Sequence, residues 1–562
     1  MKNSIISILR TIAASSVMLS LASTTFAKDI VHDAEYYVIE AQNGERWRSD
    51  DKVIDQKLAD FRKRNNNKPP NIIYILLDDL GFGEIGMPGL DVIRGYSTPH
   101  INKLASQGMS LQRMYTEPSC TPTRVAMMTG RLPIRTGINE AKVTLTGEGL
   151  PAAEVTLAEV LAGAGYNTSH IGKWHMGDIE QSFANNQGFQ RAEFPIHQQA
   201  QLALMNPQAE QSDITRGLWS DGSFPDELVL DQNFTFKAGD MLTGVELRDG
   251  KLYEVDLKPG ENWTQQKYEQ MNARYQTSVM RELKDLAAQD EPFFLNYWPL
   301  YPVTFDRRQS GAFRTRNGGS FTEAIMDVDD WIGDIMSEVD RLGISENTII
   351  MVMGDNGTMT NYMGLSGASD RIYRGGKGEH LEGGVRVNAY IRWPSMIEPG
   401  SMAEDIVHVS DVYTSMARLA GATDEIPRDR VVDGVDQSGM LLLGETHGRR
   451  DYVYIYEQNS LKSIVKNKYK FHLAPPMTNP ILSAGFYDLY RDPREERWDQ
   501  GIKMGTWASG QFSSMLKRHK GLKKKYPDRK PITATPYEGV ENLRPETQRM
   551  VDAFLSSKKS SR

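Results

Sequence analysis

The sequence predicts an α/β fold in which helices flank a large mixed, mostly parallel sheet, with a smaller C-terminal domain built on an antiparallel sheet. Apolar runs of strand length alternate with helical stretches over most of the chain. After about residue 450 the pattern changes to short segments of alternating polarity. The 562 residues, of which 39% are hydrophobic and 25% charged, have the composition of a globular protein with a sizeable core.

Strands and helices alternate from residue 71 to residue 353. The first apolar run, Asn71–Leu77, has the length of a strand that is buried on both faces. The later elements are a helix over Leu157–Ala162, a strand over Tyr166–Ile171, a helix over Ala273–Ala288, a strand over Phe293–Trp298, a helix over Thr322–Leu342 and a strand over Thr348–Met353. This alternation predicts a mainly parallel sheet, in which ligands bind at the carboxyl ends of the strands.

The first 27 residues have the pattern of a cleaved secretory signal peptide. Lys2 and Arg10 precede a short apolar run, and small residues follow as far as Ala27. The apolar segment Ile12–Ala22 is shorter than the roughly 20 residues that a membrane-spanning helix needs. We therefore expect a secreted or periplasmic protein without a stable membrane anchor.

Two domains are expected after this segment, an α/β domain over residues 28–440 and an α+β domain over residues 441–562. Residues from about 197 to 263 lack clear periodicity, and we interpret them as an insertion that walls a substrate pocket. In the second domain, the alternating segments Tyr452–Glu457 and Ser463–Leu473 predict a small antiparallel sheet.

The charge balance argues against a nucleic-acid partner. Lys and Arg total 65 against 73 Asp and Glu, so the net charge is -8 and the chain lacks the basic character of a nucleic-acid binder. The basic run Lys517–Lys530 is interpreted as a solvated helix face. Any affinity for anions must therefore be local.

Cys120 is the only cysteine of the chain, so no intramolecular disulfide can form. A lone cysteine is either a small buried hydrophobic residue or a chemical group. Pro122 suits a first helical turn, which places Cys120 at a helix N-terminus, where a negative charge is favoured. Arg124 adds a cation with planar donors for an oxyanion. A thiolate nucleophile of the cysteine-phosphatase type competes with this interpretation, but its loop needs the arginine six positions after the cysteine rather than four.

Two acidic clusters follow predicted strands. Asp78 and Asp79 come directly after the first strand, and Asp355 and Asn356 come after the strand that begins at Thr348. One such pair alone is usually a helix cap or loop polarity, but two pairs at strand ends favour a binding site. All four side chains are oxygen donors, which suits a hard cation such as Ca²⁺ or Mg²⁺ better than zinc.

These residues belong to a longer pattern. Cys120-x-Pro122-x-Arg124 is followed by Met128-Thr129-Gly130-Arg131. The further blocks are Asp78-Asp79, Thr98-Pro99 with Leu104-Ala105, Gly172-Lys173-Trp174-His175-Met176-Gly177, Gly354-Asp355-Asn356-Gly357, and Arg374-Gly375-Gly376-Lys377-Gly378 leading to Glu382-Gly383-Gly384-Val385-Arg386. The pattern, in this order, resembles the type I sulfatase family, whose signature cysteine is oxidised to formylglycine by a separate enzyme.

The resemblance implies an alkaline phosphatase-like fold and a calcium ion, with Mg²⁺ less favoured. The implied metal ligands are Asp78, Asp79, Asp355, Asn356 and an oxygen of the modified Cys120. The implied partners are a small-molecule or glycan sulfate ester as substrate and a formylglycine-generating or sulfatase-maturating enzyme that acts on Cys120.

Catalytic roles are implied in the same way. Hydrated formylglycine at position 120 attacks sulfur through one hydroxyl, while Arg124 and Lys173 support that group. Lys377 holds the sulfate, and His175 takes the remaining proton when the covalent intermediate collapses.

One departure from the family concerns the leaving group. Relatives usually have a Pro-His pair after the strand Phe293–Trp298, whereas this chain reads Tyr301-Pro302-Val303-Thr304. With valine at position 303, Lys377 or His380 must protonate the leaving oxygen. Phenolic leaving groups need less such help than sugar or steroid alcohols, which favours aryl esters. His100, His170 and His408 are interpreted as structural.

The sequence therefore favours an exported, calcium-dependent sulfuric ester hydrolase of the arylsulfatase type. A phosphonate or phosphate ester hydrolase of the same superfamily and a glycan sulfatase are the alternatives. A non-catalytic anion-binding protein is a third, less favoured class because the activation signature is intact.

Overall fold

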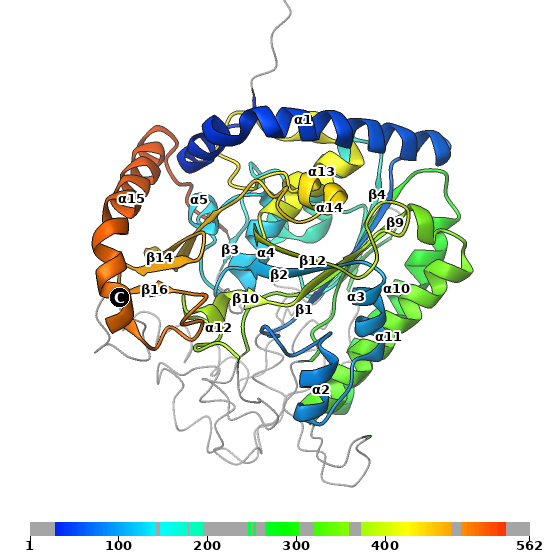
Figure 1. The fold of residues 1–562 in the computed structure, drawn as a ribbon. Coiled ribbons are helices and arrows are strands. Elements are labelled where there is room, and N and C mark those ends of the chain that lie inside the picture. Colours follow the sequence, from blue (N-terminus) through cyan, green and yellow to red (C-terminus); the bar gives the residue numbers. More distant parts are fainter. Residues whose placement is uncertain are drawn as a thin grey trace, which may run out of the picture.

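A computed structural model of the chain describes residues 29–141, 147–177, 179–194, 245–248, 251–254, 265–302, 314, 320–358, 372–474 and 485–534 (Figure 1). The predicted signal peptide and Val303 lie outside the described residues, as does most of the predicted insertion at 197–263. Among the described residues, none of the helices combines the length and the apolar character that crossing a membrane requires.

A large mixed sheet forms the centre of the molecule, with 11 strands in the described part of the chain. Its middle is parallel and consists, in spatial order, of β9 (Thr348–Gly354), β1 (Asn71–Leu77), β8 (Phe293–Trp298), β4 (Asn167–Gly172) and β5 (Arg191–Phe194). Every residue of β1, β8 and β9 is buried, as expected for strands that are covered on both faces.

Shorter strands extend the sheet on both sides. Beyond β9 lie β11 (Ala389–Arg392), β2 (Met109–Tyr115), β10 (Arg386–Val387) and β12 (Ser401–His408). Beyond β5 lie β6 (Val245–Arg248) and β7 (Lys251–Glu254). These last two strands fall within the predicted insertion, so the described part of that segment continues the sheet.

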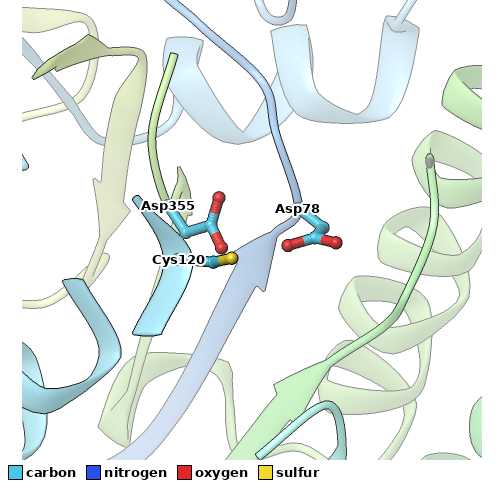
Figure 2. Close-up of side chains that lie close together, drawn as sticks. All are labelled: Asp78, Cys120 and Asp355. Carbon is cyan, nitrogen blue, oxygen red and sulfur yellow. The ribbon is translucent and has the colours of Figure 1, made fainter. Parts of the chain in front are cut away.

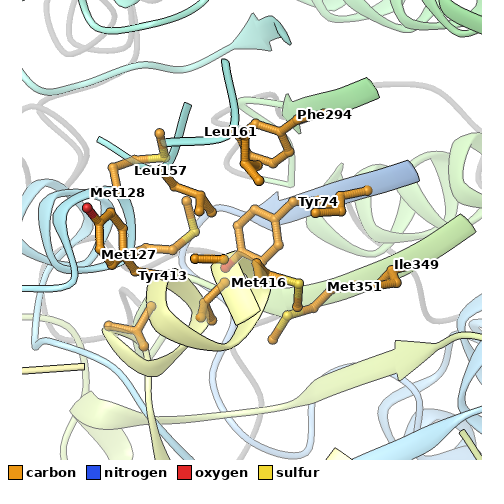
Figure 3. Close-up of a cluster of buried hydrophobic side chains, with 14 of the residues drawn as sticks. Tyr74, Met127, Met128, Leu157, Leu161, Phe294, Ile349, Met351, Tyr413 and Met416 are labelled. Carbon is orange, nitrogen blue, oxygen red and sulfur yellow. The ribbon is translucent and has the colours of Figure 1, made fainter. Parts of the chain in front are cut away.

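The side chains of β1 alternate between two hydrophobic cores, one on each face of the sheet. Tyr74 and its even-numbered neighbours pack in the first core, whereas Ile75 and its odd-numbered neighbours pack in the second. Figure 3 shows part of the first core, in which Tyr74 lies among Met127, Leu161 and Met416. The helices of the first core are α1 (Ala34–Arg64), α4 (Cys120–Thr129), α6 (Leu157–Gly163), α13 (Asp411–Ala420) and α14 (Ser438–Leu443). Those of the second are α3 (Pro99–Ser106), α10 (Gln265–Ala287) and α11 (Ser320–Arg341).

A separate antiparallel sheet follows in the C-terminal part of the chain. It consists of β13 (Tyr452–Glu457), β14 (Ser460–Lys466), β15 (Tyr469–His472) and β16 (Phe486–Asp488). The long helix α15 (Trp498–Lys525) packs against β16 (Figure 1). The predicted segment Ser463–Leu473 is divided between β14 and β15, because the chain reverses at Asn467, which has φ 54°.

The remaining helices and strands are short. They are α2 (Pro88–Arg94), α5 (Pro133–Thr136), β3 (Glu148–Gly149), α12 (Glu382–Val385), β17 (Ile532–Thr533) and the 3-10 helices Glu180–Ser182, Ala184–Asn186, Ser345–Asn347 and Thr423–Glu425.

The structure confirms the predicted fold class, since a mixed, centrally parallel sheet is flanked by helices and followed by an antiparallel sheet. Two strands, β1 and β8, have the predicted bounds, and α10 begins at Gln265, before the predicted Ala273. Helix α1 was not predicted.

Candidate active site

The candidate site forms at the carboxyl ends of β1 and β9, which are neighbours in the sheet. Leu77 is paired with Gly354, so the residues that follow, Asp78 and Asp355, are placed side by side. The amide of Asp355 donates to the Leu77 carbonyl at 2.9 Å, and the amide of Asp79 donates to Asp355 Oδ1 at 2.9 Å. A Cβ at Gly354 would lie 2.1 Å from the Leu80 carbonyl oxygen, so this close crossing requires glycine.

Cys120 joins these carboxylates from the start of α4. Its Sγ and one carboxylate oxygen from each of Asp78 and Asp355 all lie within 4.8 Å of one another (Figure 2). The side chain is fully buried. The predicted position at a helix N-terminus is confirmed, because α4 begins at Cys120 with Ser119 as its N-cap.

Arg124, one turn further along α4, bridges the two strand ends. Its Nη2 donates to Asp78 Oδ1 at 3.2 Å and to Asp355 Oδ2 at 2.8 Å, and its Nη1 donates to the Lys173 carbonyl at 2.8 Å. The guanidinium lies over the ring of Trp298 at 4.9 Å, a cation–π contact made by the last residue of β8. Both terminal nitrogens of the arginine are therefore held, whereas its buried Nε has no hydrogen-bond partner among the described residues.

Lys173 and Lys377 approach the carboxylates from different segments. Lys173 follows β4, and its Nζ donates to both oxygens of Asp78 at 2.7 and 2.9 Å. The Nζ of Lys377 lies 2.7 Å from Asp79 Oδ1 and 2.9 Å from Asp79 Oδ2. The side chain of Lys377 is 13% exposed, whereas that of Lys173 is 1% exposed. Of these two lysines, Lys377 is therefore the more exposed one.

Asn356 is oriented by its amide nitrogen. Its Nδ2 donates to Asp79 Oδ1 at 2.8 Å and to the Gly357 carbonyl at 2.7 Å. Its Oδ1 is buried and accepts no hydrogen bond in the described part of the chain. A buried amide oxygen without a donor is costly unless it has another partner, and a cation is such a partner.

The charges of the site perturb one another strongly. Burial by itself raises the pKa of Asp78, but the Lys173 ammonium and the Arg124 guanidinium outweigh it and hold that pKa well below its usual range. Burial and the nearby Asp78 carboxylate raise the pKa of Asp355 to about 7. Burial lowers the pKa of Lys377, yet Asp79 and its neighbours raise it well above the ordinary value. The crowded carboxylates would be relieved by a bound cation.

The donor set fits the metal that the sequence predicted. Asp78 and Asp355 each bring a carboxylate oxygen within 4.8 Å of Cys120 Sγ. Asp79 and Asn356, both buried, are hydrogen-bonded to each other beside them, and Asn356 Oδ1 lacks a hydrogen-bond donor among the described residues. Hard divalent cations prefer such ligands, and Ca²⁺ tolerates the irregular arrangement better than Mg²⁺, which demands near-ideal octahedral geometry.

Two of the predicted site residues have left-handed backbone conformations. Asp79 has φ 57° and His175 has φ 59°. Such conformations in residues other than glycine cost of order 1–3 kcal/mol and cluster at functional sites. His175 is buried and lies two residues after Lys173, in the segment that follows β4.

Trp298 was missed at the sequence level. Its position at the carboxyl end of a buried strand, beside the strands that carry Asp78 and Lys173, was the available signal. His380, the alternative proton donor, has its Nδ1 2.5 Å from Glu457 Oε1 and is fully buried. Val303 lies outside the described residues, so the departure at that position stays a prediction.

The model of a protein family described as Sulfatase matches residues 70–422, a range that contains all of these site residues. The chain belongs to the sulfatase family. This sulfatase is 31% identical to arylsulfatase A of Homo sapiens over 454 residues, which cover 76% of this chain and 83% of that protein. It is 30% identical to N-acetylgalactosamine-6-sulfatase of Mus musculus over 423 residues, 72% of each chain.

A solved structure supports the same assignment. The PsFucS1 sulfatase from Pseudoalteromonas sp. is similar with a TM-score of 0.73 and 25% identity, covering 86% of this chain and 96% of that one. This sulfatase is therefore an enzyme that hydrolyses sulfate esters, as the sequence predicted.

Proposed function

We propose that this sulfatase is an exported enzyme of the arylsulfatase type, which hydrolyses sulfate monoesters with formylglycine at position 120 and a bound calcium ion. The observation that carries the proposal is the approach of Cys120 Sγ to the carboxylates of Asp78 and Asp355, within 4.8 Å, with Arg124 donating to both. A purely structural cysteine would be expected among apolar side chains rather than beside these charged groups.

The chemistry at position 120 depends on a modification. Formylglycine, when formed, supplies an aldehyde whose hydrate offers a hydroxyl as nucleophile. Arg124 and Lys173, both held by Asp78, keep fixed positive charge around that group. The buried His175 takes the proton that is released when the sulfate leaves position 120.

Lys377 is the residue that we assign to the sulfate. It is the more exposed of the two lysines, and Asp79 fixes its ammonium. Calcium, when bound, supplies a Lewis acid that neutralises charge on the sulfate oxygens. Its proposed ligands are Asp78, Asp79, Asp355, Asn356 and the modified Cys120.

Export and maturation complete the proposal. Residues 1–27 act as a cleaved signal peptide, residues 28–440 form the catalytic domain and residues 441–562 form the smaller domain. A formylglycine-generating or sulfatase-maturating enzyme acts on Cys120, and the mature protein is secreted or periplasmic.

Mass spectrometry of the peptide that contains residue 120, combined with an assay on p-nitrophenyl sulfate, tests this function. We expect the aldehyde mass in active preparations and no turnover by the Cys120→Ala variant. A protein that carries a complete aldehyde and bound calcium, yet hydrolyses neither aryl nor sugar sulfates, would contradict it.

A glycan sulfate is the second candidate substrate, because this sulfatase is 30% identical to an N-acetylgalactosamine-6-sulfatase. Rates on p-nitrophenyl sulfate and on a sulfated monosaccharide separate the two. A matched aryl phosphonate tests the phosphonate alternative. A faster rate on the phosphonate than on the sulfate would contradict the proposal that a sulfate ester is the preferred substrate.

A further inference from the structure

The segment that carries Lys377, residues 372–386, lies between the two sheets. On its inner side, the amide of Lys377 donates to the Thr358 carbonyl at 3.0 Å, and the amide of Gly378 donates to the Pro118 carbonyl at 2.6 Å. Thr358 lies just after the Asp355–Asn356 pair and Pro118 just before Cys120. The inner side of the segment is therefore tied to the chain next to the catalytic and metal-binding residues.

The outer side of the segment is tied to residues of the C-terminal part of the chain. Glu457, the last residue of β13, accepts from the amide of His380 at 2.9 Å, and the same oxygen lies 2.5 Å from His380 Nδ1. Glu495 accepts from the amide of Glu382 at 2.7 Å through its Oε2, and its carbonyl accepts from Arg374 at 2.9 Å. Each glutamate thus accepts a hydrogen bond from a backbone amide that follows Lys377 by a few residues in the sequence.

Both glutamates are buried, and both are compensated by cationic or imidazole groups. Lys470 on β15 lies 3.0 Å from Glu495, and His472 Nε2 lies 2.7 Å from the same carboxylate oxygen. The rings of His380 and His472 meet edge to face at 4.8 Å. A buried carboxylate is tolerated only with such partners, so these contacts fix one geometry for the segment.

The segment has little freedom to adopt another position. The amide of Gly357 donates to the Gly384 carbonyl at 3.0 Å, and a Cβ on Gly357 would lie 1.8 Å from the Gly383 carbonyl oxygen. The backbone after Asn356 and the backbone after Lys377 are therefore in direct contact. A shift of the outer side is transmitted to Lys377 because the segment is packed between two surfaces.

We propose that Glu457 and Glu495 are positioning residues for Lys377. Through these two residues the C-terminal part of the chain would support the active site. The proposal rests on the function assigned to Lys377 above. Within the described part of the chain, neither glutamate is bonded to Asp78, Asp79 or Asp355. Glu495 acts through the Glu382 amide, and Glu457 through the amide and the imidazole of His380. A displacement of about 1 Å at a reacting or binding group can cost on the order of 100-fold in rate, so loss of this support has a measurable effect.

A double-mutant cycle tests whether Glu457 acts through Lys377. The variants are Glu457→Gln, Lys377→Ala and their combination, and the rates are measured on p-nitrophenyl sulfate with protein of known aldehyde content. We expect Glu457→Gln alone to lower kcat/KM by about 10-fold, and to change it less than about 2-fold when Lys377 is already alanine. Equal losses in both backgrounds would overturn the proposal, because they would indicate a general structural role.

Asp451→Asn is the matched control. Asp451 lies just before β13, at the end opposite Glu457, and accepts from Lys466 of β14 at 2.7 Å. This variant therefore also removes a carboxylate charge that is paired with a residue of the C-terminal sheet. We expect its kcat/KM to stay within about 2-fold of the parent. A loss equal to that of Glu457→Gln would likewise overturn the proposal.

Hydrogen–deuterium exchange gives a readout that does not depend on activity. The amides of Lys377 and Gly378 donate to the carbonyls of Thr358 and Pro118 rather than to Glu457. The Glu457→Gln substitution therefore does not itself remove a hydrogen bond of either amide. We expect faster exchange at these amides in Glu457→Gln and parent-like exchange in Asp451→Asn. Unchanged exchange in Glu457→Gln would refute the positioning role even if the parent protein proved inactive on every sulfate. If Glu457→Gln does not fold, His380→Gln and Glu495→Gln are measured with the same expectations.

Discussion

Arg124 is the residue on which the geometry of the candidate site depends most. It connects the ends of β1, β4, β8 and β9 through Asp78, the Lys173 carbonyl, Trp298 and Asp355. Lysine has neither the fork of donors nor the flat face that these contacts use. We expect Arg124→Lys to lower kcat/KM by at least about 100-fold and the free energy of unfolding by about 3 kcal/mol. The measurements are hydrolysis of p-nitrophenyl sulfate and urea unfolding.

Arg113→Lys is the control for this prediction. Arg113 is also buried and also lies over an aromatic ring, that of Tyr490, but it is bonded to the Asn467 carbonyl away from the site. Its kcat/KM is expected to stay within about 2-fold of the parent. A parent-like rate in Arg124→Lys would show that the bridge is not needed for catalysis.

The Asn356 side chain gives a prediction about the metal alone. Asn356→Ala removes the buried Oδ1 that has no hydrogen-bond donor among the described residues, together with the Nδ2 hydrogen bond to Asp79, but it removes no carboxylate. We expect calcium affinity, measured by titration and by metal content after dialysis, to fall at least about 10-fold. Asn388→Ala, which removes a buried amide bonded to Gly83 and Tyr390, serves as the control. Parent-like calcium binding by Asn356→Ala would remove this residue from the ligand set.

Single residues of the site differ in how far the sequence predicts them. Asp78 and Asp355 follow recognisable strands, so the rule that ligands bind at carboxyl ends of parallel strands places them together. Trp298 and Glu457 also end predicted strands, but the sequence does not indicate which residues they contact. Their roles depend on contacts with Arg124 and His380, which are far away in the sequence and become neighbours only through the packing of the sheets.

At the level of elements, α4 is unusual because all ten of its residues are buried. Cys120 at its start has no exposed surface. A reagent therefore reaches the thiol only after α4 has separated from the core, and the proposed conversion of Cys120 to formylglycine would have to precede folding.

The accessibility of the thiol can be measured on unconverted protein. We expect Ellman's reagent to modify Cys120 at least about 1,000-fold more slowly in the native protein than in denaturant, since exchange of core groups with solvent requires unfolding. Val125→Ala removes buried methyl groups and so loosens the packing of α4. We expect Ellman's reagent to modify Cys120 faster in this variant than in the native parent protein. Rapid native modification at a rate independent of denaturant would contradict this account.

Helix α1 shows why an element escaped the sequence analysis. Its core residues Ile54, Leu58 and Phe61 have the i, i+4, i+7 spacing of an amphipathic helix, so a signal was present, but only seven of its 31 residues are buried. Its start is fixed by Asp33, whose side chain accepts from the Glu35 amide. Strands such as β1 were easier to predict because all of their residues are buried and, in β1, all but Asn71 are apolar.

On the scale of the whole molecule, buried ion pairs connect segments that are distant in the sequence. Asp33 accepts from Arg135 at 3.0 Å and lies 2.8 Å from His519 Nδ1, while Arg135 also donates to Asp433. The start of α1, the segment after α4 and helix α15 thus meet at one point. No sequence pattern predicts such a meeting, because each charge has many candidate partners until the fold selects one.

Buried histidines give the molecule a defined response to acid. The pKa of His170 and that of His408 are lowered to about 3, and those of His32 and His472 to about 4, with burial as the first cause in each case. The unfolded chain, with histidine pKa values of about 6.5, binds more protons than the folded one between pH 6.5 and 4. Stability contributed by these groups is therefore complete above pH 6.5 and is lost as the pH falls.

Each such histidine contributes a slope of up to about 1.4 kcal/mol per pH unit. Buried carboxyl groups whose pKa is raised act in the opposite direction, among them Asp329, with a pKa of about 6, and Asp355, with a pKa of about 7. The contribution of one histidine is therefore measured as the difference between the parent and a variant, by urea unfolding with calcium present between pH 6 and 4.5. His170→Gln is expected to reduce the slope by about 1.4 kcal/mol per pH unit, because Gln keeps a donor for the Gly172 carbonyl and takes up no proton on unfolding. An unchanged slope in that variant would show that His170 is protonated in the folded protein, in conflict with its burial among Trp174, Phe189 and Trp298.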